Sequence, residues 1–98
     1  LCVAWSKKSN PMTLGDAFDY CANLTEGELS GWDIPTREEI STMVNNYNPI
    51  DDTLGDLWTS TEDTTSGLYW TVNLEQPGME VLLDPSDETH VRCVTSIR

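Results

Sequence analysis

The chain has 98 residues and carries 17 acidic against five basic side chains, which gives a formal net charge of -12 at neutral pH. Nucleic acid and anionic membranes are excluded as partners, because phosphate groups bind clustered lysine and arginine. Four tryptophans and 38% hydrophobic residues favour a folded core. This length accommodates one domain, which we expect over residues 1–98. No apolar run reaches the roughly 18–20 residues of a membrane span, so we expect no direct membrane insertion.

The first half of the chain predicts a short strand and two helices. Leu1–Trp5 is short and apolar, as expected of an opening strand. Thr13 lies three residues before Asp16 and precedes apolar residues at helical spacing, which predicts an N-cap and a helix of about three turns. The run Thr36–Glu39 is a complete capping box, so a second helix should follow it and end before Pro49.

The second half of the chain predicts strands. From Trp58 onward the apolar residues recur with a period of two, as in residues 68–74 and 79–83. Gln76–Met79 between these two segments suits a type II turn. Helices followed by an antiparallel meander indicate an α+β fold.

The apolar positions of these elements predict the core. Val91 and Cys93 share one face of an expected last strand, with Arg92 on the opposite face. Trp32, Trp58 and Trp70 are candidates for sugar-stacking platforms, but packing inside the domain is the favoured interpretation. The residues that we expect to be buried are Phe18, Leu24, Ile40, Val44, Trp58, Trp70, Val72, Val81 and Val91.

A series of segments along the chain resembles one protein family. After Trp5 the series runs through Met12–Leu24, Gly31–Ile40, Trp58–Thr61, Tyr69–Val72 and Val91–Val94. It is similar to the DUF1566 or Lcl C-terminal domain family of bacterial surface and secreted proteins, and to the related Fibrobacter major paralogous domain. Both are variants of the C-type lectin-like fold. The resemblance therefore implies two helices packed on a small antiparallel sheet, with long loops and one disulfide.

The resemblance also bears on particular residues. The three cysteines by themselves allow one disulfide and one odd thiol; the resemblance implies that Cys21 pairs with Cys93, which leaves Cys2 over. Asp33 stands where relatives usually carry a basic residue. Some relatives bind sulfated polysaccharides, which requires a basic surface, so we do not expect that activity in a chain of charge -12.

Acidic residues gather beside the strand that contains Trp58. If consecutive loops bring them together, they form a patch for a ligand or cation; these residues are Asp51, Asp52, Asp56, Glu62 and Asp63. Calcium takes six to eight oxygen ligands, but the EF-hand pattern is missing from the sequence. We therefore expect a solvated acidic surface, no metal site and no cofactor, with a calcium site as the alternative.

The residue pattern does not indicate an enzyme. His90 is the sole histidine, and no nucleophile lies at a motif spacing from it. Formylglycine-generating enzymes, which share the implied fold, rely on a reactive cysteine pair, whereas the expected disulfide leaves only Cys2.

Together these features predict a non-enzymatic binding or adhesion module with a lectin-like fold, exported by a bacterium to its surface or to the extracellular space. A disulfide implies an oxidising compartment. The module would recognise a surface ligand, either a glycan or a protein, through its loops. The alternative is a structural subunit that self-associates in a pilus, fibre or surface assembly.

Overall fold

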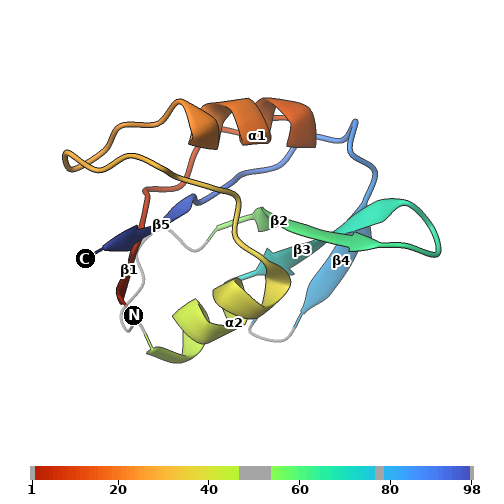
Figure 1. Cartoon of the computed structure of the whole chain (residues 1–98). Coiled ribbons are helices and arrows are strands. Elements are labelled where there is room, and N and C mark those ends of the chain that lie inside the picture. The colour runs from red at the N-terminus through yellow and green to blue at the C-terminus, as the bar shows by residue number, and fades with distance from the viewer. Residues whose placement is uncertain (1, 47–53, 77–78, 98) are drawn as a thin grey trace.

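The computed structural model describes residues 2–46, 54–76 and 79–97 (Figure 1). Its elements, in chain order, are β1 (Cys2–Trp5), α1 (Leu14–Ala22), α2 (Arg37–Asn46), β2 (Asp56–Asp63), β3 (Leu68–Asn73), β4 (Glu80–Leu83) and β5 (Val94–Ile97). Two helices on small antiparallel sheets confirm the α+β class within these ranges. Neither of the described helices has the length and apolar character that crossing a membrane requires.

The strands form two separate antiparallel sheets. β2, β3 and β4 make the expected meander, whereas β5 pairs with β1 and brings the two ends of the chain together (Figure 1). The prediction of a last strand at Val91 and Cys93 is wrong, because β5 begins one residue later. Backbone bonds join Val91 and Cys93 to the segment before α1 instead: Ser9 N–H donates to the Val91 carbonyl and Ser6 N–H to that of Cys93.

Both predicted helix starts are confirmed. Thr13 Oγ1 accepts a hydrogen bond from the Asp16 N–H at 3.3 Å. At α2 the capping box is reciprocal: Glu39 N–H donates to Thr36 Oγ1 at 3.1 Å, and Thr36 N–H donates to Glu39 Oε1 at 2.8 Å. These bonds satisfy backbone donors that a helix otherwise leaves unpaired at its first turn.

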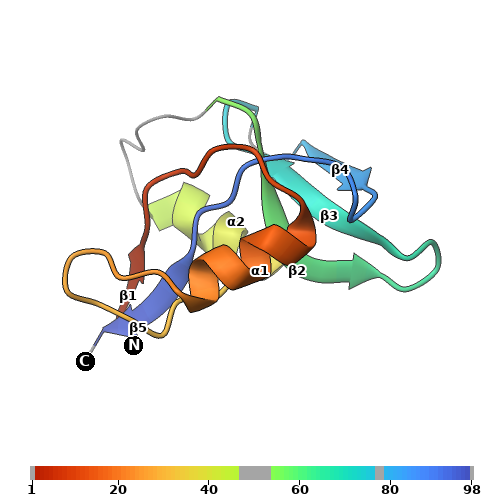
Figure 2. The ribbon, with the colours of Figure 1, turned by 90° about the horizontal axis from the view of Figure 1, so that it is seen from above.

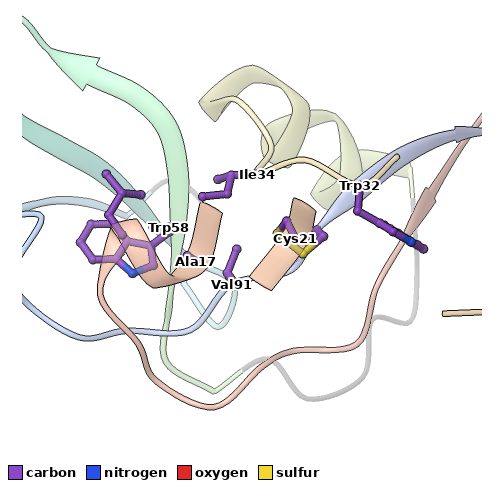
Figure 3. Packing of buried hydrophobic residues seen from close by; sticks show 8 residues of the cluster. Ala17, Cys21, Trp32, Ile34, Trp58 and Val91 are labelled. Carbon is purple, nitrogen blue, oxygen red and sulfur yellow. A yellow bond between two sulfur atoms is a disulfide. The ribbon is translucent and has the colours of Figure 1, made fainter. Parts of the chain in front are cut away.

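The three-stranded sheet separates two hydrophobic clusters. Leu57 and Trp58 are neighbours on β2 and therefore point to opposite faces of the sheet. Trp58 packs with the α1 side, in a cluster of Leu14, Ala17, Cys21, Trp32, Ile34, Trp58, Val91 and Cys93 (Figure 3). Leu57 packs with the α2 side, in a cluster of Ile40, Met43, Leu57, Val72 and Leu74. In Figure 1, α1 lies above β2 and α2 lies below it, and in Figure 2, which is seen from above, α1 is in front.

The predicted core is confirmed at Ile40, Trp58, Val72 and Val91, which are all buried. Two further predictions are wrong. Phe18 is 45% exposed because the buried stripe of α1 runs through Leu14, Ala17 and Cys21, which places Phe18 at its border. Val81 is 38% exposed because it lies on β4, the edge strand of the meander.

The remaining core predictions have intermediate or open outcomes. Leu24 and Trp70 are only half-buried. The side chain of Val44 lies outside the described residues, as do the two central residues of the expected Gln76–Met79 turn. The Met79 N–H does donate to the Gln76 carbonyl at 2.9 Å, the bond that closes a β-turn.

Candidate ligand-binding cleft

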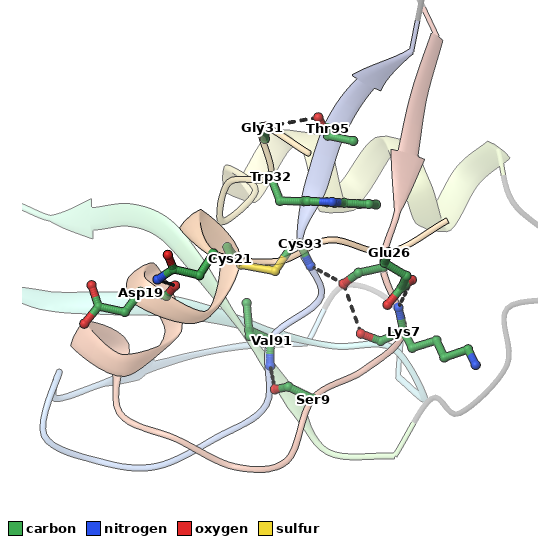
Figure 4. Close-up of a disulfide and its surroundings, with 12 residues drawn as sticks. Lys7, Ser9, Asp19, Cys21, Glu26, Gly31, Trp32, Val91, Cys93 and Thr95 are labelled. Atoms are coloured by element: carbon green, nitrogen blue, oxygen red, sulfur yellow. Dashed lines mark hydrogen bonds between the residues drawn. A yellow bond between two sulfur atoms is a disulfide. The ribbon is translucent and has the colours of Figure 1, made fainter. Parts of the chain in front are cut away.

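A disulfide closes the domain on the α1 side of the sheet. Cys21 on α1 is bonded to Cys93, 72 residues later, as the family resemblance implies (Figure 4). Both residues are fully buried. The backbone beside the bond is also fixed, because the Cys93 N–H donates to Ser6 Oγ at 2.7 Å. The covalent bond therefore lies within a packed core, with no exposed sulfur to react.

The acidic residues beside the Trp58 strand do not converge within the described part of the chain. Asp56 begins the eight-residue strand β2, and Glu62 and Asp63 end it. The Asp56 carboxylate accepts a bond from Asn73 Nδ2 at 3.1 Å, and the Asp63 carboxylate accepts one from the Ser66 hydroxyl at 2.7 Å. Asp51 and Asp52 lie outside the described residues.

Two other polar candidates have local structural contacts. The His90 ring donates from Nδ1 to the Ser9 carbonyl at 2.7 Å, which holds the ring against the segment before α1. Asp84 accepts from the N–H and the hydroxyl of Ser86, and these two bonds lower the pKa of the Asp84 carboxyl. In the described ranges, no three His, Cys, Asp or Glu residues lie close enough together to hold a metal ion.

A cleft of about 390 Å³ opens between α1, the start of α2 and the β1–β5 sheet. Phe18 lines it from α1, Ser60 from β2 and Ser96 from β5. The segment between the two helices, which crosses the front of the molecule in Figure 1, contributes Asp33. The start of α2 contributes Thr36 and Glu39, and β1 contributes Val3, so six parts of the chain build the site.

Hydrogen bonds to β5 hold the Asp33 side of the cleft in place. The Asp33 N–H donates to the Val94 carbonyl and the Val94 N–H donates to that of Asp33, both at 2.9 Å. Thr95 Oγ1 donates to the carbonyls of Ser30 and Gly31 (Figure 4). Gly31 has a φ of +74°, a left-handed conformation that glycine adopts without strain. The backbone under Asp33 is thus fixed before any ligand arrives.

The polar side chains of the cleft keep bonding capacity. Asp33 is exposed, and its carboxylate makes no hydrogen bond or ion pair with another described residue. Glu39 uses Oε1 in the capping box, and its Oε2 has no partner among the residues described. The Thr36 hydroxyl accepts from Glu39 and retains its own proton, and Ser60 Oγ bonds only to the Pro35 carbonyl at 3.4 Å. The cleft therefore offers oxygen acceptors and hydroxyl donors beside an aromatic ring.

A second arrangement, on the α2 side of the sheet, explains why Trp70 is half-buried. The Arg37 guanidinium lies over the Trp70 ring, 4.1 Å from its centroid. Arg37 also pairs with Glu80 through Nε and Oε2, and through Nη2 and Oε1 at 2.8 Å. The hydrogen bonds between the two side chains raise the pKa of Arg37 and lower that of Glu80. The guanidinium covers the ring, so Trp70 offers no free platform on that face.

Sequence reasoning missed the cleft because its residues come from distant parts of the chain. The departure at Asp33 from the usual basic residue was the one available signal. The position of Phe18 gave a misleading signal, since its helical spacing suggests a buried residue. Neither pattern shows that the two side chains line one cavity.

The fold and the cleft define a small, disulfide-closed α+β domain with an open cleft lined by both polar and apolar side chains. The sequence model of the Lcl C-terminal domain matches residues 2–95, and the chain belongs to this family. The match includes both disulfide cysteines and every residue of the cleft discussed above except Ser96. Comparison with curated proteins gave no match.

Proposed function

We propose that the domain is a non-enzymatic bacterial binding and adhesion module with a C-type lectin-like fold, and that its cleft recognises a glycan. The main observation that supports this proposal is the cleft. Binding sites for small ligands combine an apolar surface with a few well-placed polar groups. The half-exposed ring of Phe18 can stack on the apolar face of a sugar, and the oxygens of Asp33, Glu39 and Ser60 can bond its hydroxyl groups.

The disulfide supports a location outside the cytoplasm. Such bonds persist in oxidising compartments, which include the periplasm and the cell exterior. The Cys21–Cys93 bond is buried in the main cluster and joins segments 72 residues apart, so the fold depends on it. We therefore propose that the domain acts at the cell surface or in the extracellular space.

A glycan array tests this function, with Phe18→Ala compared against Met79→Ala as a matched control. The two side chains are almost equally exposed, at 45% and 46%, but only Phe18 lines the cleft. We expect Phe18→Ala to weaken the array signal about tenfold, the loss of one stacking contact of roughly 1.4 kcal/mol. Met79→Ala should bind like the wild type. Equal binding by all three proteins would contradict a role for the cleft.

Self-association is the second candidate function. It is favoured by β4, an edge strand on which Val81 is exposed. The residue directly before this strand, Met79, is exposed as well. Unpaired edge strands readily pair with another chain. Light scattering over a range of concentrations distinguishes the two functions, because a building block polymerises whereas a binding module stays small.

Calorimetry tests the proposal that the module needs no metal cofactor. The acidic residues of β2 are divided between its two ends, and no three acidic, histidine or cysteine side chains of the described ranges lie together, whereas calcium takes six to eight oxygen ligands. We expect calcium followed by a chelator to change the melting temperature only slightly. A large shift reversed by the chelator would identify a calcium-dependent lectin instead.

A further inference from the structure

We infer that the cleft selects glycans that carry a free, protonated amino group, and that Asp33 is the residue responsible for this selection. The inference rests on the proposed function, because it takes the cleft as the glycan site and names the class of sugar. It follows from the charges that line the cavity, from the carboxylate oxygens that are left unused and from the hydroxyl groups around them.

The charges in the cleft are of one sign. Asp33 and Glu39 are the charged residues among the described residues that line it, and neither lysine nor arginine joins them. The nearest basic residue in the sequence, Arg37, bonds to Glu80 and lies over Trp70 on the α2 side of the sheet. A concave site with uncompensated negative charge concentrates cations, and the net charge of -12 strengthens this effect.

The positive end of the α2 dipole does not cancel this charge. A helix N-terminus carries roughly half a positive charge on its unpaired N–H groups. Here Thr36 and Glu39 already bind first-turn backbone donors, and Glu38 adds another carboxylate to the same turn. The carboxylate of Asp33 lies before the helix and accepts no bond from the described N–H groups of its first turn.

The unused bonding groups match an ammonium group on a sugar. An ammonium group has three donors and no acceptor. Asp33 offers two carboxylate oxygens without a described partner, and Glu39 offers Oε2. Bonds between an ammonium and a carboxylate are roughly twice as strong as neutral ones. The exposed ring of Phe18 adds an attractive face for a cation.

The hydroxyl groups favour an amino sugar over the side chain of a basic peptide. A lysine side chain has a four-carbon apolar stem, which needs an apolar slot. Apolar side chains also line the cleft, but it places the hydroxyls of Thr36, Ser60 and Ser96 beside the carboxylates. A sugar ring offers hydroxyl groups that can bond these side chains, whereas a lysine stem offers none.

The test compares two oligosaccharides that differ only in charge: a β-linked glucosamine tetramer and its fully N-acetylated counterpart. Binding is measured by calorimetry at pH 6 and low salt with the wild type, Asp33→Asn and Glu62→Gln. Glu62 is exposed near the C-terminal end of β2 and does not line the cleft, so its variant removes one negative charge outside the lining. Both substitutions are on the surface, and thermal melts confirm that each variant is folded.

We expect the glucosamine tetramer to bind the wild type about tenfold more tightly than the acetylated one, and salt to reduce the difference. Asp33→Asn should abolish this preference, so that the two tetramers bind the variant with equal affinity. Glu62→Gln should keep the preference. This pattern would assign the selection to a specific contact rather than to net charge.

Three outcomes would overturn the inference. Equal affinity for the two tetramers with Phe18-dependent binding would leave the cleft as a glycan site without selection for amines. If Asp33→Asn and Glu62→Gln weakened binding of the glucosamine tetramer equally, the preference would come from the overall negative charge of the protein and not from Asp33. Tighter, Asp33-dependent binding of a lysine tetrapeptide would show that the ligand is a basic peptide and not an amino sugar. Failure of every glycan to bind would instead contradict the proposed function itself.

Discussion

The two faces of the β2–β3–β4 sheet bury their tryptophan side chains to different extents. Trp58, on the α1 side, is fully buried, and its Nε1–H donates to the Met12 carbonyl at 2.9 Å. Trp70, on the α2 side, is half-buried under the guanidinium of Arg37. The first ring is enclosed by a helix and a disulfide-linked segment, whereas the second is covered by one charged side chain.

This difference shows where the stability of the domain is concentrated. Burial of a large apolar side chain contributes more than a partly solvated contact between a cation and a ring. The α1 side also contains the Cys21–Cys93 bond. We therefore expect substitutions on the α1 side to be costly and substitutions on the α2 side to be mild, which the following predictions test in decreasing order of effect.

The largest effect is expected on removal of the disulfide. The bond closes a loop of 72 residues, and the chain-entropy model gives about 4 kcal/mol for a loop of this size. The double variant Cys21→Ala and Cys93→Ala should lose about that much free energy of unfolding in urea denaturation. Cys2→Ser serves as the control, since this cysteine is not part of the bond. A loss below about 1 kcal/mol would show that the α1 side does not depend on the bond.

The second prediction compares the two tryptophans directly. Trp58→Ala should cost about 3–5 kcal/mol, because it leaves a cavity and removes the indole bond to the Met12 carbonyl. Trp70→Ala should cost about 1–2 kcal/mol, because its ring is already partly in water. Thermal or urea unfolding of the two variants gives the difference. Equal losses would mean that the two faces are equally important.

The third prediction concerns the helix caps. Thr36→Ala should lower the free energy of unfolding by about 1 kcal/mol, because it removes the hydroxyl that accepts from the Glu39 N–H in the capping box. Thr13→Ala removes a single, longer bond of 3.3 Å and should cost less. Urea denaturation of both variants ranks them. A larger loss at Thr13 would indicate that α1, packed against the disulfide, amplifies the loss of its cap.

The smallest effect is expected at Glu80. Its pKa is lowered in the folded protein by the bond to Arg37, so its stabilising contribution is complete above the ordinary value of 4.5 and is lost as the pH falls through the lower folded value. The pair is partly exposed, which limits its contribution to less than about 1 kcal/mol.

Glu80→Gln measures this contribution. The wild type should be slightly more stable than the variant at pH 6, and the difference should be smaller at pH 3. Unfolding free energies at the two pH values provide the test. A difference that stays constant with pH would mean that the charge of Glu80 does not stabilise the fold.

Much of the fold follows from local sequence patterns. The capping residues Thr13 and Thr36 mark the two helix starts, because a cap depends on atoms only three residues away. The alternation from Trp58 onward marks the meander for the same reason, since side chains of a strand alternate between its two faces. The family resemblance adds the pairing of Cys21 with Cys93, which no local pattern contains.

The sequence-based predictions are wrong where residues from distant segments determine burial or strand pairing. Phe18 has the spacing of a core residue, but the cleft lies beside it, and Val81 alternates correctly but belongs to an edge strand. Residues 91–93 look like a strand, yet their backbone bonds go to the segment before α1. The burial of a side chain and the pairing of a strand depend on which distant segment packs against it. The periodicity of the sequence contains no information about that segment.

The sequence by itself determined the α+β class, the helix starts and the acidic character of the domain. Only the tertiary structure decided how the polar residues are grouped. It divided Asp56 from Glu62 and Asp63 between the ends of β2, and it brought Asp33 and Glu39 into one cleft. The physical reason is that a site forms only when residues from different segments lie close together. Those distances are set by packing in the two hydrophobic clusters and by the disulfide within one of them.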